Sequence, residues 1–361
     1  MLYYFFEHLT QYYSSFDVFR YLTLRIILSA LTALTLSLII GPVVIRYLSR
    51  NRLYQTIRED GPQSHLDKKS ETPSMGGLII IISVLVSTLL WADIFSKYIW
   101  ILIFILLTFG LIGFYDDYQK FRHSSSAGIS GKTKLLYQII FSGIIAYFIY
   151  TTAMSSIETS LTMPFLKNFA LNLGILFIPW TIFVIVGSSN AVNLTDGLDG
   201  LAILPCILIA AAFVLFAYVE GNFNIANYLL IPYLSGVSEI AIFSSAIVGS
   251  GLGFLWYNSY PAQVFMGDVG SLSLGAILAT IAVLLRLEIV YAIMGGVFVL
   301  EALSVMIQVA SYKIFKKRVF KMSPIHHHFE LKGWPEPKII VRFWIITFIL
   351  VLIALASLKI R

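Results

Sequence analysis

The sequence predicts an all-α membrane protein, a polytopic bundle of about ten transmembrane helices that forms a single domain over residues 1–361. Three observations lead to this prediction. Of the 361 residues, 58% are hydrophobic and only 12% are charged, whereas a soluble chain carries about 25% charged residues. A hydrophobic content of 58% gives more apolar surface than one soluble core can bury. The apolar residues also lie in long blocks rather than in the short alternating strands of a membrane barrel.

The first 20 residues are expected to lie at the membrane–water boundary. They mix aromatic side chains such as Tyr3 and Phe5 with polar groups, which suits the interface better than the hydrocarbon centre. No basic residue precedes Arg20. We therefore expect no cleaved secretory signal, because such a signal needs a positively charged first region.

Ten apolar stretches follow, and we interpret each as a membrane-spanning helix. A hydrocarbon layer about 30 Å thick needs about 20 mostly apolar residues, and backbone groups in lipid must be bonded within the segment. Two stretches are short, and the ninth is expected to break near Gly295 and Gly296. In chain order the spans are Tyr21–Ile45, Gly76–Trp91, Tyr98–Tyr115, Leu135–Thr152, Leu171–Ser189, Leu201–Val219, Ser238–Tyr257, Ser271–Leu285, Ile289–Tyr312 and Ile339–Leu358.

The basic residues predict the orientation of the bundle. Five loops on one side hold 17 of the 25 Lys and Arg residues, and basic loops face the cytoplasm. An even number of spans then places both termini outside. These five cytoplasmic loops are Arg46–Met75, Asp116–Lys134, Asn190–Gly200, Asn258–Gly270 and Lys313–Lys338.

Acidic residues gather at helix ends on the same predicted side. Asp116 and Asp117 end the third span, and Asp268 precedes the eighth. An isolated Asp-Asp pair is more often a hydrated loop, and Asp268 alone could cap a helix. Two loops, Asn190–Gly200 and Asn258–Gly270, carry acids but no Lys or Arg, so topology does not explain them. Converging carboxylates favour a cytoplasmic active-site cleft that holds a cation or a base.

Magnesium is the cation that this pattern favours. Mg²⁺ takes one or two carboxylates and leaves its other positions to water and phosphate oxygens. Calcium fits less well, because no segment has the ligand spacing of an EF-hand loop.

The Asn190–Gly200 string adds two further acids. Asp196 and Asp199 are three residues apart, so on a helical turn they would share a face with Asn193. Gly197 and Gly200 permit a ligand to approach the backbone closely. A capped turn would account for one Asp and one Gly, but not for the whole string.

A histidine triplet, His326, His327 and His328, lies in the last basic loop. Consecutive residues diverge, so a zinc site is awkward and contact with phosphate is favoured. For the flanking lysines, a topology signal or an anchor for anionic lipid explains the charges equally well. Glu301 and Gln308 lie inside the ninth span and must face protein or a water-filled cleft.

The sequence excludes one class of protein and gives no sign of another. The single Cys206 permits neither an intrachain disulfide scaffold nor a zinc ribbon. No Gly-x-x-x-x-Gly-Lys loop is present, so ATP hydrolysis is not indicated.

Five motifs follow one another along the predicted cytoplasmic face: Pro73–Gly77, Asp116–Tyr118, Asn190–Gly200, Phe265–Gly270 and Pro324–Glu330. Together they resemble the motifs of the phospho-N-acetylmuramoyl-pentapeptide transferases, a branch of the polyprenyl-phosphate N-acetylhexosamine-1-phosphate transferases. The resemblance covers essentially the whole chain, in the family's motif order, with Ser74 where the family more often has Thr.

The resemblance implies transfer of phospho-MurNAc-pentapeptide from UDP-MurNAc-pentapeptide to undecaprenyl phosphate, giving lipid I and UMP with Mg²⁺ in peptidoglycan synthesis. It places the protein in the bacterial cytoplasmic (inner) membrane, as a multi-pass protein among membrane lipids. A homodimer is an expectation from the family alone, and no nucleic-acid partner is implied.

The resemblance also implies catalytic residues. Asp268 would hold Mg²⁺ on the donor pyrophosphate. Asp116 would deprotonate or orient the acceptor phosphate, with Asp117 supporting it. His327 and His328 are implied as catalytic as well, with His327 facing phosphate. A direct displacement and a covalent intermediate on an Asp both remain open.

Further positions are implied as substrate-binding. The uracil would stack on Phe265, with Lys69, Asp199 and Asn258 around it, and His326 would face phosphate. The positions implied in the rest of the donor pocket are Ser74, Asn190, Asn193, Asp196, Gln308 and His328.

Two rival functions remain. A related transferase could move GlcNAc-1-phosphate to a carrier for O-antigen or teichoic acid, but the Pro324–Glu330 block resembles the muramoyl branch. A proton- or cation-coupled transporter could also carry intramembrane acids. Against it, the acids lie at helix ends rather than at mid-depth.

Overall fold

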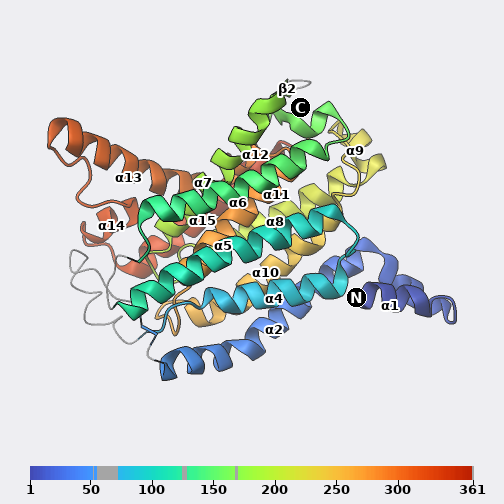
Figure 1. The fold of residues 1–361 in the computed structure, drawn as a ribbon, viewed down its shortest axis with the longest axis horizontal. Helices are drawn as coiled ribbons and strands as arrows, with labels where there is room; N and C mark the ends of the chain where they lie inside the picture. Colours follow the sequence, from blue (N-terminus) through green and yellow to red (C-terminus); the bar gives the residue numbers. More distant parts are fainter. Residues whose placement is uncertain (52, 55–71, 124–127, 167–169, 360–361) are drawn as a thin grey trace.

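A computed structural model describes residues 1–51, 53–54, 72–123, 128–166 and 170–359. Within them, nine helices are long and apolar enough to cross a membrane, and most of them lie side by side in a bundle, from which α13 projects (Figure 1). The prediction of an all-α polytopic membrane protein is confirmed. The longer helices are α2 (Leu22–Arg50), α4 (Gly77–Trp91), α5 (Lys97–Arg122), α6 (Gly131–Thr151), α7 (Phe177–Thr195), α8 (Ile203–Glu220), α10 (Glu239–Asn258), α11 (Gly267–Leu284), α13 (Gly296–Phe315) and α15 (Glu336–Ala356).

Short elements connect these helices. The two strands pair antiparallel, with Leu161 opposite Leu171. The short elements are α1 (Leu2–Leu9), η1 (Ser14–Arg20), η2 (Ser156–Thr159), β1 (Ser160–Thr162), β2 (Ala170–Asn172), η3 (Gly174–Leu176), α9 (Phe223–Leu229), α12 (Glu288–Met294) and α14 (Ile325–Glu330).

Each of the ten expected spans contains a helix, with three qualifications. The fifth stretch begins at Leu171 in strand β2, and its α-helix starts only at Phe177. Helix α4 has 15 residues, fewer than the about 20 that a full crossing needs. The ninth stretch is divided at Gly295 into α12 and α13, as its glycine pair predicted.

Several predicted helix ends are wrong, and the errors fall on the candidate site. Helix α5 continues to Arg122 rather than ending at Tyr115, so Asp116 and Asp117 are helical. Helix α11 begins at Gly267 rather than Ser271, which places Asp268 in its first turn. Polar residues extend each helix beyond the apolar window from which its span was read.

Helix α11 forms the centre of the bundle. Every residue from Val269 to Leu284 is buried, and the helix packs against α4, α5, α7 and α8. Two glycines let its neighbours approach its first turn. A Cβ on Gly113 of α5 would lie 2.2 Å from the Asp268 carbonyl oxygen, and one on Gly77 of α4 would lie 2.2 Å from the Gly270 nitrogen. These close approaches bring the ends of α4 and α5 to the start of α11.

Met1 and Lys359 lie at the end of the bundle opposite to the start of α11 (Figure 1). The Met1 ammonium group donates to the Leu89 carbonyl oxygen (2.6 Å), and the Lys359 ammonium lies 4.3 Å from the centre of the Tyr228 ring. The expected interfacial segment folds into α1 and η1 against this end rather than into a span.

Candidate active site

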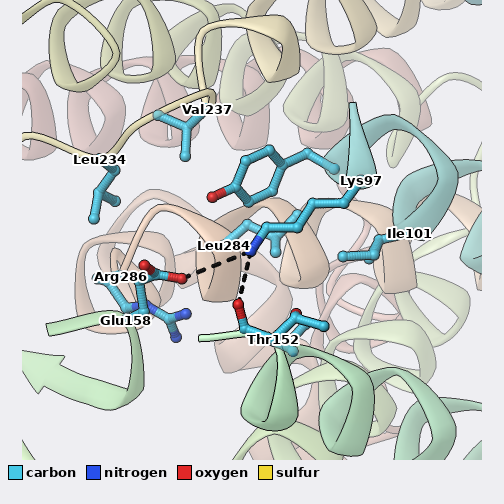
Figure 2. A pocket seen from close by; sticks show the side chains of 10 residues that line it. Lys97, Ile101, Thr152, Glu158, Leu234, Val237, Leu284 and Arg286 are labelled. Carbon is cyan, nitrogen blue, oxygen red and sulfur yellow. Dashed lines mark hydrogen bonds and ion pairs between the residues drawn. The ribbon is translucent and has the colours of Figure 1, made fainter. Parts of the chain in front are cut away.

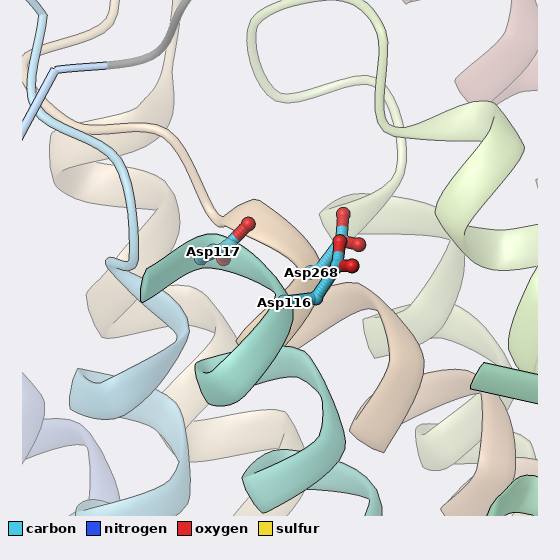
Figure 3. Close-up of side chains that lie close together, drawn as sticks. All are labelled: Asp116, Asp117 and Asp268. Carbon is cyan, nitrogen blue, oxygen red and sulfur yellow. The ribbon is translucent and has the colours of Figure 1, made fainter. Parts of the chain in front are cut away.

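Three carboxylates converge where α5 ends and α11 begins. Asp116 and Asp117 come from α5 and Asp268 from α11, and one oxygen of each lies within 4.8 Å of the others. Figure 3 shows Asp116 and Asp268 side by side, with Asp117 on the neighbouring side of α5. The predicted convergence of these acidic segments is therefore confirmed.

Two lysines lie against this acidic cluster and offset part of its negative charge. The Lys120 ammonium lies 2.7 Å from Asp116 Oδ2, 3.3 Å from Asp117 Oδ1 and 3.1 Å from Asp268 Oδ2. The Lys134 ammonium lies 2.5 Å from Asp268 Oδ2 and 3.5 Å from Asp116 Oδ2. Neither lysine was among the site residues expected from the sequence. Lys120 lies four residues after Asp116, so a prediction that continued α5 would have placed the two side chains together. Lys134 follows a loop, and no helical spacing relates it to Asp116.

Amide groups hold the carboxylates in place. The backbone N–H of Ile129 donates to Asp116 Oδ1 (2.8 Å), and that of Val269 donates to Asp117 Oδ2 (3.3 Å). The Asn193 side chain donates to Asp268 Oδ1 (2.8 Å) and to Ser271 Oγ (2.8 Å). Buried carboxylates require such partners, so this cluster is fixed by α7 as well as by α5 and α11.

The Pro73–Gly77 motif lies beside the same cluster. The amides of Gly76 and Gly77 donate to the carbonyl oxygens of Phe265 (2.8 Å) and Met266 (2.9 Å), and the Phe265 amide donates to Pro73 (2.9 Å). Gly267 has φ +70°, and a Cβ there would lie 2.6 Å from Asp117 Oδ2 and 2.9 Å from Ser74 Oγ. The structure thus brings Ser74 beside Asp117 and fixes the backbone of half-buried Phe265 two residues before Gly267.

The Asn190–Gly200 string does not form the shared face that was predicted. Helix α7 ends at Thr195, with Asp196 as its C-cap residue. Asn193 turns to Asp268, whereas Asp199 accepts from the Ala262 amide (3.0 Å). The helical face that would have aligned these side chains stops before Asp199, which explains the difference.

Two other predicted site residues fasten neighbouring segments. The buried Asn258 side chain accepts from the Gly200 amide (3.1 Å) and donates to the Val264 carbonyl oxygen (2.9 Å). Asn190 donates to Gln138 Oε1 (2.8 Å). Asn258 thus binds the backbone on both sides of it, whereas Asn190 joins α7 to the Gln138 side chain of α6.

The histidine block forms α14, beside α13. The His327 ring contacts Glu330 through Nδ1 (2.6 Å), and Gln308 binds the backbone of Val319 and Phe320. His326 is fully buried. Lys69, the remaining predicted substrate residue, lies outside the described residues.

The His328 ring is neutral in this arrangement. The Lys321 amide donates to its Nδ1 (3.1 Å), which requires that nitrogen to be unprotonated. Slight burial and the charges of Lys332 and Lys321 also hold the pKa of this imidazole below its usual range.

The acidic cluster has the donor set of a divalent-metal site. Its ligands are carboxylate oxygens, which hard cations such as Mg²⁺ prefer, and they converge within metal-binding range. Lys120 and Lys134 supply positive charge at the same oxygens. The residues therefore fit a divalent cation, and the lysines could also bind phosphate oxygens.

A separate polar pocket lies at the other end of α5 (Figure 2). The Lys97 ammonium, which lines it, donates to the Thr152 carbonyl oxygen (3.0 Å) and lies 4.0 Å from Glu158. At about 1.5 Å per helical residue, Lys97 stands about 28 Å from Asp116. This pocket is therefore not part of the acidic cluster.

A comparison with protein-family models adds a finding that the geometry alone does not give. The model described as "Glycosyl transferase family 4" matches residues 99–286, more than half of the chain. The match contains Asp116, Asp117 and Asp268, whereas the Pro73–Gly77 and Pro324–Glu330 motifs lie outside it. The chain therefore belongs to glycosyl transferase family 4, as a membrane sugar-1-phosphate transferase of the polyprenyl-phosphate hexosamine-1-phosphate type.

Proposed function

We propose that this protein transfers phospho-MurNAc-pentapeptide from UDP-MurNAc-pentapeptide to undecaprenyl phosphate, giving lipid I and UMP in peptidoglycan synthesis. The observation that carries the proposal is the convergence of Asp116, Asp117 and Asp268 with two lysines at the ends of α5 and α11. The choice of the muramoyl donor is supported by the resemblance of the Pro324–Glu330 block.

The proposed reaction exchanges one phosphoanhydride for another. An oxygen of the acceptor phosphate attacks the sugar-bearing phosphorus of the donor, and the bond to the UMP oxygen breaks. Asp116 takes the proton of the acceptor phosphate when that phosphate is monoprotonated, and Asp117 supports it. The same carboxylates would also serve a two-step route through an aspartyl phosphate. Because the anhydride is conserved, no ATP is needed.

Charge on the donor pyrophosphate requires cations. Asp268 is the proposed ligand of Mg²⁺, which when bound supplies positive charge to the pyrophosphate and to the leaving UMP. Lys120 and Lys134 reach the same carboxylate, so their ammonium groups are placed to bind phosphate oxygens as well.

The nucleotide is proposed to lie against Phe265. Hydrogen bonds to Pro73 and Gly76 fix the backbone of this residue on both sides, so its half-buried ring offers a held stacking surface for uracil. Lys69, Ser74, Asp196, Gln308 and the two histidines His327 and His328 are the proposed contacts around the donor.

The location follows from the same proposal. The protein is a multi-pass membrane protein, and we place the site on the cytoplasmic face of a bacterial inner membrane, where a soluble UDP-sugar meets a lipid acceptor. The proposed partners are the two substrates and membrane lipids, with no nucleic acid; a homodimer is an expectation from the family alone.

The position of the three carboxylates along their helices disfavours a transporter. Asp116 and Asp117 lie in the last two turns of α5, and Asp268 lies in the first turn of α11. Transporters hold coupling ions near the bilayer midplane. The acidic cluster instead stands where helices end, which suits a water-soluble donor.

A donor panel tests the proposal. Purified protein in nanodiscs with Mg²⁺ and undecaprenyl phosphate is offered UDP-MurNAc-pentapeptide or UDP-GlcNAc, with D268N as the matched control. UMP release from the muramoyl donor alone is expected. Release from UDP-GlcNAc instead would favour the O-antigen or teichoic-acid rival.

A further inference from the structure

Helix α14 is too short to orient its histidines by itself. It has six residues, and its N-cap residue, Pro324, makes no side-chain capping bond. Helices this short are not stable in isolation. The direction in which the three imidazoles point must therefore be set by contacts from other elements.

One such contact is the fully buried Glu301 of α13. Its Oε2 accepts from the Ile325 amide (2.8 Å), and its Oε1 lies 3.1 Å from His326 Nδ1. The first of these satisfies an amide at the start of α14, which has no partner within the helix. Because a carboxylate only accepts, His326 Nδ1 carries the hydrogen. Glu301 thus binds α14 through the backbone and a side chain at once.

His326 extends this contact to the turn after α7. The side chain is fully buried, and its Nε2 has no hydrogen-bond partner among the described residues. A Cβ on Gly197 would lie 2.4 Å from that Nε2 and 3.0 Å from Cε1. The ring therefore fits against Gly197, close to Asn193, whose amide binds Asp268. This packing links α14 to the turn after α7, the helix whose Asn193 binds Asp268.

The other two rings of the triplet are held differently. The His327 ring is oriented by Glu330, and the His328 ring by the Lys321 amide. Both are half-buried, unlike His326. The triplet is thus divided into one enclosed ring and two rings that reach the surface.

We infer that Glu301 and His326 form a positioning pair, which docks α14 on the Gly197 turn so that His327 and His328, and not His326, contact the substrate. The inference rests on the proposed function for the identity of that substrate. It replaces the expectation that His326 faces phosphate and gives Glu301 a role that the sequence left open.

A double-mutant cycle between Gly197 and His326 tests the pair. The variants are G197A, H326A and the double variant, each measured for melting temperature in detergent and for kcat and donor KM. We expect each single substitution to raise the donor KM about tenfold, within the range of coupling between residues in contact. In the double variant the second substitution should add almost nothing, since removing the ring leaves room for the new methyl group.

Variants at Glu301 supply a graded comparison. E301Q keeps an acceptor for the Ile325 amide and should retain more donor binding than E301A, with a melting temperature close to that of the wild type. The control is S304A, which removes another buried polar group of α13 whose hydroxyl bonds only the Glu301 carbonyl oxygen among the bonds described. It should leave the donor KM unchanged.

Additive effects of G197A and H326A, in KM or in melting temperature, would overturn the inference. So would an H326A variant with a wild-type KM and a reduced kcat, since that result would assign His326 to the chemistry. If the wild type turns over no UDP-sugar, the proposed function fails, while the melting-temperature cycle still decides whether His326 and Gly197 are coupled.

Discussion

The acidic cluster depends on compensation at each carboxylate. Asp116 and Asp117 are buried, and burying a charge is unfavourable unless it is paired and hydrogen-bonded. Here the compensation comes from two lysines and from the Ile129, Val269 and Asn193 amide groups. Substituting one carboxylate should therefore change the charge balance without unfolding the bundle.

The first prediction separates the metal ligand from the base. D268N should lower turnover at least about 100-fold, because the amide keeps the shape but loses the charge that retains a hard cation. Its residual activity should need more Mg²⁺. D116N should also be impaired, yet with a near-normal Mg²⁺ midpoint. Turnover measured against Mg²⁺ concentration checks this; rescue of D116N but not D268N would reverse the two roles.

The second prediction concerns metal affinity without substrate. The Lys134 ammonium lies 2.5 Å from Asp268 Oδ2, where it competes with a cation for the same oxygen. A unit charge near 4 Å is worth about 4 kcal/mol at an effective dielectric of about 20, so K134Q should bind Mn²⁺ at least about tenfold more tightly while losing turnover. Calorimetry with Mn²⁺ measures this.

The matched control for that measurement is K132Q. Lys132 is exposed and stands two residues before Lys134, so the K132Q substitution removes the same charge outside the cluster. Equal Mn²⁺ affinity in K134Q and K132Q would show that Lys134 does not compete for the carboxylates.

At the scale of helices, the site depends on how closely α5 approaches α11. The two helices meet at Gly113, where a Cβ would lie 2.2 Å from the Asp268 carbonyl oxygen. That oxygen belongs to backbone and cannot move aside like a flexible side chain. The distance between Asp116 and Asp268 is therefore set by a residue that has no chemistry of its own.

The third prediction follows from this contact. G113A should destabilise the protein by about 1–3 kcal/mol, as overpacking does, and should lower turnover by separating the carboxylates. G187A is the control, because nothing lies within 4 Å of a Cβ on that helical glycine. Thermal unfolding in detergent and turnover are compared. Equal behaviour of the two variants would contradict the proposed spacing role.

Helix ends were the least predictable part of the fold. The apolar pattern located a helix in every expected span, because a helix that crosses lipid needs a long run of apolar residues. It stopped α5 at Tyr115, since Asp116 and Asp117 are polar, although both are helical and their carboxylates bind the Ile129 and Val269 amides. Such bonds join residues far apart in the chain and leave no periodic pattern.

The same limit applies to the candidate site. Charge asymmetry placed its loops on one face, so the convergence of Asp116 and Asp268 could be predicted. The fastening roles of Asp199 and Asn258 could not, because each binds the backbone of a distant segment. The contact of Lys134 with Asp268 could not be predicted either, because Lys134 lies on another helix, after a loop.

At the scale of the whole molecule, the arrangement predicts which side each end occupies. Met1 and Lys359 lie at the end of the bundle away from the acidic cluster (Figure 1), whereas Lys120 and Lys134 lie at the cluster itself. The fourth prediction is that alkaline phosphatase fused after Arg361 is active in cells, whereas a fusion truncated after His123 is inactive. The reverse pattern would place the acidic cluster outside the cytoplasm and remove its access to a UDP-sugar.

The fifth prediction concerns the bond that breaks. A sugar-1-phosphate transferase cleaves the donor between its two phosphorus atoms, whereas an ordinary glycosyltransferase leaves both phosphates on the nucleotide. The measurement uses UDP-MurNAc-pentapeptide with radioactive phosphorus in the sugar-bearing phosphate, undecaprenyl phosphate in nanodiscs, and Mg²⁺. We predict that the label enters the lipid fraction as unlabelled UMP appears in equal amount. Label that remained in released UDP, or in a water-soluble sugar phosphate, would contradict the account.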